Sequence, residues 1–345
     1  MPAILPASGL ADMSSGAKVR ALAAKTVAAV LTGSALDEPL AKYKAGLSDK
    51  DQGFLSALSF GTLRRYPRHA AVIEHLLRNP KKPLNPMMRA LLALGLEQII
   101  ATRVPPHAAV SATVAASRFV NQSKGSGFLN AILRRYLREQ EDIDSALKDD
   151  ERFVHQHPQW LVDKFRTDWP DDWQQILQAG NEQPPMWLRV NERKCSRADY
   201  LKLLAGNGIG ATSTELNTTG ILLHEPVNVD ALPHFSEGWV SVQDIGAQLA
   251  ATLVNARPQQ RILDACAAPG GKALHILETS PDSQLVAMDI SAAGLARVSE
   301  NCARAGVTDK VQLIAANATE PQDWWDGTPF DTVLVDAPCL SLIHI

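Results

Sequence analysis

Hydrophobic residues recur at helical spacing through the first 140 positions of the chain. Five segments place apolar side chains three and four residues apart: 18–31, 54–63, 88–99, 107–120 and 128–138. The polar positions agree with helices, because Ser48 and Asp51 form a capping pattern and Pro86 stands where a helix can begin. No strand-like alternation interrupts these segments, so this part of the chain is predicted to be an all-α domain.

The pattern changes beyond this helical part. Residues 139–151 are acidic and suit a linker or an exposed helix end, and residues 152–180 suit short aromatic-rich helices. A helical stretch, 197–205, then lies among apolar runs of strand length. These runs are Trp187–Val190, Gly220–His224 and Trp239–Val242. They predict a small α+β segment.

From Arg261 onward, strands and helices alternate. Four strands are predicted: Arg261–Ala265, Gln284–Asp289, Val311–Ala315 and Asp331–Asp336. Helices over 270–278 and 292–305 separate the first three strands, and a helix over 244–253 precedes them. Such alternation predicts a parallel sheet with right-handed crossovers, as in Rossmann-like α/β domains.

The composition is that of a folded globular protein, with 46% hydrophobic and 21% charged residues among 345. No run of about 18 apolar residues is present, so no membrane span is expected. The four cysteines lie too far apart for a zinc site of the usual spacing, and they are expected to be reduced thiols in the cytoplasm. Met13 precedes Ser-Ser-Gly and the first helical pattern, so it is a second candidate for the start of the protein.

Charge is divided unevenly along the chain. Residues 1–138 hold 19 Lys and Arg against 7 Asp and Glu, a net charge of +12, and the remaining residues have a net charge of −15. A basic first part favours contact with a polyanion. An ordinary solvated helical surface has the same composition, so charge alone leaves both interpretations open.

A glycine-rich loop follows the first strand of the alternating region. Asp264–Lys272 reads Asp-Ala-Cys-Ala-Ala-Pro-Gly-Gly-Lys and opens a helix, where small residues let a ligand approach free N–H groups. The spacing is neither that of a dinucleotide-binding loop nor that of a phosphate-binding loop. Asp289 ends the next strand, about 20 residues on, where a carboxylate can accept hydrogen bonds from a ribose. Loop and aspartate together predict a nucleoside site, although the loop alone is equally typical of a structural turn.

Two further polar residues follow strand ends. Asn317 comes after the third strand and Asp336 ends the fourth, so both are expected at the carboxyl edge of the sheet, where open α/β sheets bind ligands. Asn317 alone is more typical of a turn or a helix cap. The motif Asp-Ala-Pro-Cys puts the Cys339 thiol on the same edge, whereas the other three cysteines are interpreted as inert thiols.

Taken together, Asp264–Lys272, Asp289 and Asp336–Cys339 resemble the RNA (cytosine-5) methyltransferase family. Gly238–Asp244 resembles the short segment that these enzymes carry before the catalytic domain. Three helical segments resemble the NusB-type RNA-binding domain: 88–92, 104–108 and 128–134. The order of these parts is that of bacterial small-subunit ribosomal RNA methyltransferases, and the resemblance covers about residues 15–339.

The resemblance implies a multi-domain protein that binds small-subunit (16S) ribosomal RNA. A monomer is expected separately, because the acidic second part offers no obvious dimer patch, although the oligomeric state stays open. The expected parts are a NusB-like helical RNA-binding domain (15–140), a helical linker (141–183), a small α+β segment (184–245) and an incomplete Rossmann-like methyltransferase domain (246–345). Arg134, Arg135 and Arg138 lie along one predicted helix and are candidates for phosphate contacts, with a solvated helix face as the alternative.

S-adenosylmethionine is the implied methyl donor, and no metal is expected. By resemblance, the donor is bound by Cys266, Ala267, Ala268, Pro269, Gly270, Gly271, Lys272, Asp289, Asn317 and Asp336. The loop would wrap the methionine end, Asp289 would hold the ribose, and Asp336 would lie by the donor and the target base. Asn317 stands where the family usually has an aspartate on the adenine side, so a charge is lost there.

The resemblance also implies catalysis by cysteine. A thiolate that adds to carbon 6 of cytosine makes carbon 5 electron-rich enough to attack the methyl group of the donor. Cys339 matches the cysteine that assists release of the product, whereas the attacking cysteine lies in a later motif of the family. No other cysteine here lies at a suitable place, and four strands are present where such sheets normally have seven. We therefore expect a truncated or frame-shifted sequence that does not methylate cytosine.

Two other functions stay open. A non-catalytic RNA-binding protein acting through the basic helical domain would keep salt-sensitive RNA binding without residues 240–345. A nicotinamide-dependent oxidoreductase is disfavoured by the spacing of the glycine loop. Stabilisation by nicotinamide nucleosides or by methionine nucleosides would separate that oxidoreductase from a methyltransferase.

Overall fold

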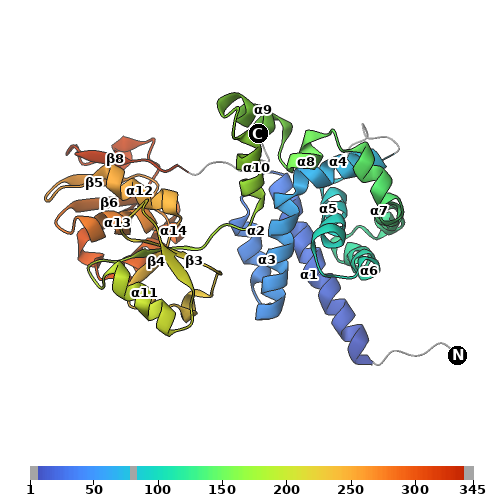
Figure 1. The fold of residues 1–345 in the computed structure, drawn as a ribbon, viewed down its shortest axis with the longest axis horizontal. Helices are drawn as coiled ribbons and strands as arrows, with labels where there is room; N and C mark the ends of the chain where they lie inside the picture. The colour runs from blue at the N-terminus through green and yellow to red at the C-terminus, as the bar shows by residue number, and fades with distance from the viewer. Residues whose placement is uncertain (1–6, 78–83, 338–345) are drawn as a thin grey trace. The chain divides into compact units, whose positions relative to one another are not determined.

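The computed structural model of the protein describes residues 7–77 and 84–337. The chain divides into two compact units, with the boundary between Glu182 and Gln183 (Figure 1). Among the described helices, none combines the length and the hydrophobicity that a bilayer span requires.

The first unit is helical throughout its described part, which confirms the predicted all-α class. Two short 3-10 helices, η1 (Ser117–Val120) and η2 (Ser123–Gly125), connect its sixth and seventh α-helices. The α-helices are α1 (Ala7–Leu31), α2 (Asp37–Lys44), α3 (Asp49–Arg64), α4 (Tyr66–Leu76), α5 (Pro86–Ala101), α6 (Pro106–Ala116), α7 (Ser126–Ala146), α8 (Glu151–His155), α9 (Gln159–Asp168) and α10 (Trp173–Asn181).

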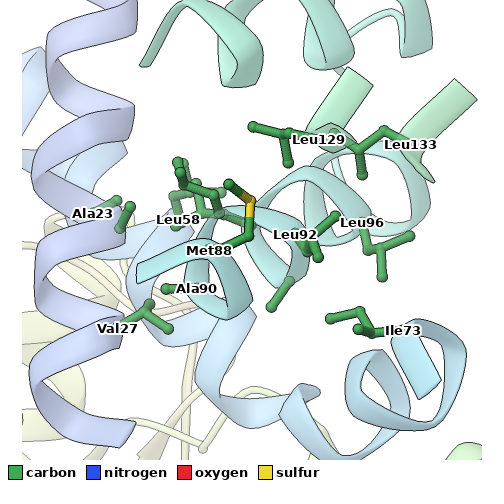
Figure 2. Packing of buried hydrophobic residues seen from close by; sticks show 14 of the residues in the cluster. Ala23, Val27, Leu58, Ile73, Met88, Ala90, Leu92, Leu96, Leu129 and Leu133 are labelled. Atoms are coloured by element: carbon green, nitrogen blue, oxygen red, sulfur yellow. The ribbon is translucent and has the colours of Figure 1, made fainter. Parts of the chain in front are cut away.

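Helix α5 lies at the centre of the core of this unit. It packs against α1, α3, α4, α6 and α7, which explains why its sequence is apolar nearly all round. Figure 2 shows side chains of α5 among those of four neighbouring helices. The labelled residues are Met88, Ala90, Leu92 and Leu96 of α5, Ala23 and Val27 of α1, Leu58 of α3, Ile73 of α4, and Leu129 and Leu133 of α7.

The helix starts follow the signals in the sequence. The Ser48 hydroxyl accepts a hydrogen bond from the backbone N–H of Asp51 at 3.3 Å. Ser48 is therefore the N-cap of α3, which begins at Asp49. Pro86 is the first residue of α5, and the side chain of Asn85 accepts from the N–H of Met87 at 2.8 Å. Both patterns therefore have the local geometry that their residues predict.

Helix α7 extends well beyond the predicted end at residue 138. It bends at Glu139, where φ is −115° and ψ is 20°, and continues to Ala146. Ile143 and Leu147 are buried in the core, so the apolar face of the helix persists across the bend. Most of the acidic stretch 139–151 is thus the end of a helix and not a linker.

The second unit begins with a small antiparallel sheet. Its strands are β1 (Trp187–Val190), β2 (Ala211–Ser213), β3 (Gly220–Leu223) and β4 (Val240–Val242), in the order β2-β3-β1-β4. Helix α11 (Arg197–Gly206) packs on it through Tyr200 and Leu204. The sequence pattern missed β2, because this edge strand has three half-buried or exposed residues and no apolar alternation.

A four-stranded parallel sheet follows, as predicted, with the order β7-β6-β5-β8. Its strands are β5 (Arg261–Asp264), β6 (Gln284–Asp289), β7 (Val311–Ala315) and β8 (Thr332–Leu334). Helices α12 (Ile245–Val254), α13 (Gly271–Thr279) and α14 (Ala292–Ala305) pack into one core with Ile262, Leu285 and Ala287. The other face of the sheet carries Leu263, Val286 and Met288, which pack against Trp324 and Phe330.

The order of the strands determines where a ligand can bind. From β5 the chain crosses to β6 and then β7 on one side, and β8 pairs with the opposite edge of β5. This reversal is a topological switch point between β5 and β8, the position at which open α/β sheets hold ligands beyond their carboxyl ends.

Candidate functional site

The glycine-rich loop is held by the strands on both sides of β5. The N–H of Ala265 donates to the carbonyl oxygen of Leu334, the last residue of β8, at 2.9 Å, and the N–H of Ala267 donates to the carbonyl oxygen of Met288 in β6 at the same distance. The loop therefore lies across the switch point with its backbone fixed at two places.

Asp289 lies directly against this loop. One carboxylate oxygen accepts from the N–H of Ala268 at 3.1 Å, and the other accepts from the N–H of Ser291 at 2.9 Å. The side chain thus connects the end of β6 to the loop and stays partly exposed. Each carboxylate oxygen has a second lone pair, so Asp289 can still accept hydrogen bonds from a ligand.

Gly270, the N-cap residue of helix α13, has a backbone conformation that other residues rarely adopt. Its φ is +101°, and a Cβ at this position would lie 3.3 Å from the Cα of Val298. The glycine therefore allows the loop to turn sharply and to pack closely against α14. The free N–H groups of the first turn of α13 consequently face the carboxyl edge of the sheet.

Asp264 ends β5 and is the first residue of the predicted loop motif, but the sequence analysis did not assign it a binding role. It is 1% exposed, and neither carboxylate oxygen has a hydrogen-bond partner among the described residues. Burial raises the pKa of its carboxyl group to about 6, and the nearby Lys272 charge opposes this shift. Its position at a strand end before the glycine loop was the available signal.

A pocket of about 180 Å³ opens at the switch point. Seven of the ten predicted donor-binding residues line it: Cys266, Ala267, Ala268, Pro269, Gly271, Lys272 and Asp336. Lys272 forms an ion pair with Asp336 across it, which brings the loop after β5 and the end of β8 together. The sequence prediction missed Asp264, Gln243, Val242 and Ala247, which also line this pocket.

Asn317 does not line the pocket. Its side-chain oxygen accepts from the N–H and the hydroxyl of Thr319 at 3.1 and 2.9 Å, and its nitrogen donates to Glu320 at 3.1 Å. These bonds are those of a turn residue, the alternative that its isolated occurrence favoured.

The described cysteines differ in their surroundings. Cys302 is buried in α14, where burial raises the pKa of its thiol to about 11. Burial, followed by the nearby Asp289 charge, raises the thiol pKa of Cys266 in the loop, and burial raises that of Cys195 in the small sheet region. None of the three is therefore poised as a thiolate. Cys339 lies outside the described residues.

The three predicted RNA-binding arginines lie on α7, and two of them have an acidic partner. Arg135 and Arg138 both donate to Glu139 at 2.7 Å, and Arg135 also donates to the carbonyl oxygen of Leu76 at 3.0 Å. Arg134 is exposed and donates to the Asn130 side chain at 3.0 Å. The helix thus presents Arg134 with its charge uncompensated, whereas Glu139 offsets part of the charge of the other two.

Three family models match successive parts of the chain. They are the NusB family over residues 17–138, the ferredoxin-like domain of RsmF/B-like methyltransferases over 157–230, and 16S rRNA methyltransferase RsmB/F over 251–345. The ribosomal RNA small subunit methyltransferase B of Pseudomonas syringae pv. tomato is 44% identical over 322 residues, which are 93% of this chain and 71% of that protein. The chain belongs to the ribosomal RNA small subunit methyltransferase B family. The Vibrio cholerae member is 40% identical over 93% of this chain and 74% of its own length.

Solved structures agree on the fold of this family. The crystal structure of PH0851 aligns with 98% of this chain and 76% of its own, with a TM-score of 0.68 at 18% identity. A methyltransferase homologue from Pyrococcus horikoshii aligns with 57% of this chain and 65% of its own, with a TM-score of 0.51 at 25% identity. The resemblance found in the sequence and the predicted order of fold classes are thereby confirmed.

Proposed function

We propose that this site serves S-adenosylmethionine-dependent methylation of carbon 5 of a cytosine in small-subunit (16S) ribosomal RNA. The observation that carries the proposal is the pocket at the switch point, in a chain 44% identical to a ribosomal RNA small subunit methyltransferase B. That relative's name supports ribosomal RNA as the substrate. The choice of cytosine and of carbon 5 rests on the motif resemblance of the loop and of Asp336–Cys339.

The residues of the pocket fit the chemistry of this donor. S-adenosylmethionine carries a positive sulfonium and a positive ammonium group, and the edge of the sheet offers the carboxylates of Asp264, Asp289 and Asp336. Asp264 has unused acceptors that a buried donor group would satisfy. The backbone at Cys266–Gly271 would hold the methionine end and Asp289 the ribose. When bound, S-adenosylmethionine supplies an electrophilic methyl group.

The proposed reaction proceeds through a covalent bond between cysteine and cytosine. A thiolate adds to carbon 6, and the electron pair that develops at carbon 5 would take the methyl group, with the sulfur of the donor leaving as a neutral thioether. A base then removes the carbon-5 proton, and the carbon–sulfur bond breaks to restore the aromatic ring and the thiolate. By resemblance, Cys339 assists this release and is not the attacking group.

The helical unit is proposed to bind and orient the RNA. The net charge of +12 on residues 1–138 supports contact with phosphates, with Arg134, Arg135 and Arg138 as candidates. The target cytosine must leave any base stack before it reaches the pocket, and positioned phosphates help to hold it there. We further propose that the protein is a monomer and acts in the cytoplasm, where ribosomal RNA is present.

Residues 1–345 by themselves are proposed to bind the donor without transferring its methyl group. Cys302 is buried, Cys195 belongs to the small sheet region, and Cys266 lies in the donor loop, so none is suited to attack cytosine. With Cys339 assigned to product release, this set of thiols lacks an attacking group.

Two measurements test the proposal. In isothermal titration calorimetry, S-adenosylmethionine should bind residues 1–345 with one site, and the Asp289→Ala variant should bind at least about tenfold more weakly. A folded chain that binds no S-adenosylmethionine would overturn the cofactor assignment.

Activity is best tested with a chimera. In it, Cys339 is followed by the corresponding remainder of the Pseudomonas syringae relative, which is longer than this chain. The chimera should transfer tritiated methyl groups to unmethylated 16S ribosomal RNA, at a cytosine that then resists bisulfite deamination. Residues 1–345 alone should transfer none. Methylation at another atom or base would refute the carbon-5 assignment.

A further inference from the structure

Arg189 is the largest fully buried side chain of the described residues, and it lies on β1 of the small sheet. Its guanidinium group makes four hydrogen bonds within the second unit. Two go to the carboxylate of Glu278 in α13, from Nε at 3.0 Å and from Nη2 at 2.9 Å. This bidentate pair supplies the countercharge that a buried arginine requires.

The other two bonds lead toward the pocket. Nη1 donates to the carbonyl oxygen of Gly271 at 2.7 Å and to the side-chain oxygen of Gln243. Gly271 is the first residue of α13, and both Gly271 and Gln243 line the pocket at the switch point. Arg189 therefore connects the small sheet to two residues of the pocket wall, although it does not itself line the pocket.

The contact with Arg189 determines how the Gln243 amide is oriented. A guanidinium group only donates hydrogen bonds, so Gln243 must turn its oxygen toward Arg189 and its nitrogen away. The nitrogen donates to the carbonyl oxygen of Ala247 at 3.3 Å and lies 3.5 Å from the place of a Cβ on Gly271. Both neighbours line the pocket. The bond to Ala247 is the one hydrogen bond of the amide nitrogen among the described residues, so its second N–H remains available to a ligand.

We propose that Arg189 is a positioning residue for the donor site and that Gln243, oriented by it, donates a hydrogen bond to the methionine carboxylate of S-adenosylmethionine. The inference rests on the proposed function, because it takes that donor as the ligand. It follows that the small sheet region takes part in cofactor binding. Arg189 also keeps the first turn of α13 in place through Gly271.

Arg304 on α14 serves as a comparison for Arg189, because it makes similar contacts away from the pocket. It too joins the small sheet region to a methyltransferase helix, because Nη1 donates to the carbonyl oxygens of Phe235 and Val240 at 2.9 and 2.8 Å. Neither of these partners lines the pocket. If the only task of such arginines were to hold the two parts together, changing Arg304 and changing Arg189 would affect the donor site alike.

The deciding experiment uses two probes and three variants of the 345-residue chain. Calorimetry measures the dissociation constants of S-adenosylmethionine and of decarboxylated S-adenosylmethionine, which lacks the methionine carboxylate. Gln243→Glu keeps an oxygen acceptor for Arg189 but removes the N–H that would meet the ligand. Arg189→Lys removes the fork that reaches Glu278 and Gln243 together. Arg304→Lys is the control, and urea unfolding measures the stability of every variant.

Gln243→Glu should raise the dissociation constant of S-adenosylmethionine about tenfold, leave that of the decarboxylated probe within about twofold, and unfold near the unmodified chain. Arg189→Lys should also weaken S-adenosylmethionine about tenfold, whereas Arg304→Lys should lose stability and keep the affinity. Equal weakening of both probes by Gln243→Glu, or no weakening of either, overturns the inference. If the unmodified chain binds neither probe, the proposed function itself fails.

Discussion

Glu97 in α5 of the helical unit and Asp264 at the end of β5 are both buried carboxylates, with 3% and 1% of their surface exposed. Glu97 accepts a hydrogen bond from Arg65 at 2.7 Å, and its second oxygen lies 3.0 Å from the imidazole Nε2 of His69. Neither oxygen of Asp264 has a partner among the described residues. A buried carboxylate thus has partners for both of its oxygens in the helical unit, whereas the one at the end of β5 has none among the described residues.

The presence or absence of partners distinguishes a carboxylate that stabilises the fold from one that is available to a ligand. Partners supplied by the same unit hold that unit together, and removing one of them leaves the other buried without a countercharge. A buried carboxylate without partners reduces stability, and a protein can retain it where a ligand brings the missing donors. The helical unit also supplies a partner for a buried cation, because Arg20 donates to the neutral side chain of Gln98 at 2.6 Å in its core.

The largest effect is expected from removing the saturated carboxylate. Glu97→Ala leaves Arg65 and His69 without their shared partner, so we expect a loss of about 3–5 kcal/mol in the free energy of unfolding. Urea unfolding followed by far-UV circular dichroism measures it. The exposed Glu141→Ala on α7 is the control and should stay within about 0.5 kcal/mol of the unmodified chain. A loss below about 1 kcal/mol for Glu97→Ala would contradict a structural role.

In contrast to Glu97→Ala, the Asp264→Asn substitution is expected to increase the free energy of unfolding. Burial raises the pKa of this carboxyl group from 3.8 to about 6, so the folded state binds the proton more tightly than the unfolded state. Stability is therefore lost as the pH rises from 3.8 to about 6. Asparagine cannot ionise, so the variant should be more stable by up to about 3 kcal/mol at pH 8.

Urea unfolding of both proteins at pH 8 and pH 3.5 tests whether the gain in stability comes from ionisation of Asp264. At pH 3.5 the wild-type carboxyl group is already protonated, and the two proteins should unfold at nearly the same urea concentration. The variant should also bind S-adenosylmethionine more weakly, because it lacks the buried negative charge. A gain in stability that is equal at both pH values would show that ionisation of Asp264 is not its cause.

The sequence predicts elements well where local pattern and sheet position agree. Gln284–Asp289 and Val311–Ala315 have the predicted bounds, because both are mostly apolar runs of strand length within the alternation of strands and helices. Strand β2 could not be predicted, since its three residues gain their structure only by pairing with β3. A strand with its own apolar run can therefore be predicted from the sequence, whereas a strand that depends on pairing with its neighbour cannot.

The candidate site shows the same limit. The loop, Asp289 and Asp336 follow from their positions at strand ends, and all three lie at one edge of the sheet. The role of Arg189 could not be predicted, because its partner Glu278 is 89 positions away and β1 belongs to another sheet. In contrast, Glu139 lies within four residues of Arg135 and Arg138, so the sequence contained the signal for these ion pairs.

A smaller effect, on RNA affinity, is expected at the surface of the helical unit, where Glu139 pairs with Arg135 and Arg138. Glu139→Gln removes the partner of Arg135 and Arg138 and should strengthen binding of a 16S ribosomal RNA fragment about threefold, with a steeper dependence on salt. Filter binding at several salt concentrations measures both. Glu141→Gln removes the same charge from the same helix and should change the affinity less. Equal effects of the two variants would mean that total charge, and not release of these arginines, controls binding.

The smallest effect is expected at Asn317, whose polar atoms are saturated by its own turn. Asn317→Asp keeps the two bonds that its oxygen accepts from Thr319 and loses the one donated to Glu320. The added negative charge would lie outside the pocket but at the same edge of the sheet as the proposed cationic donor, so S-adenosylmethionine should bind at most about threefold more tightly. The double variant with Glu320→Gln removes the repulsion between the new carboxylate and Glu320. If the double variant alone binds more tightly, Glu320 controls this position, whereas a tenfold gain for Asn317→Asp would mean that residue 317 leaves its turn to contact the donor.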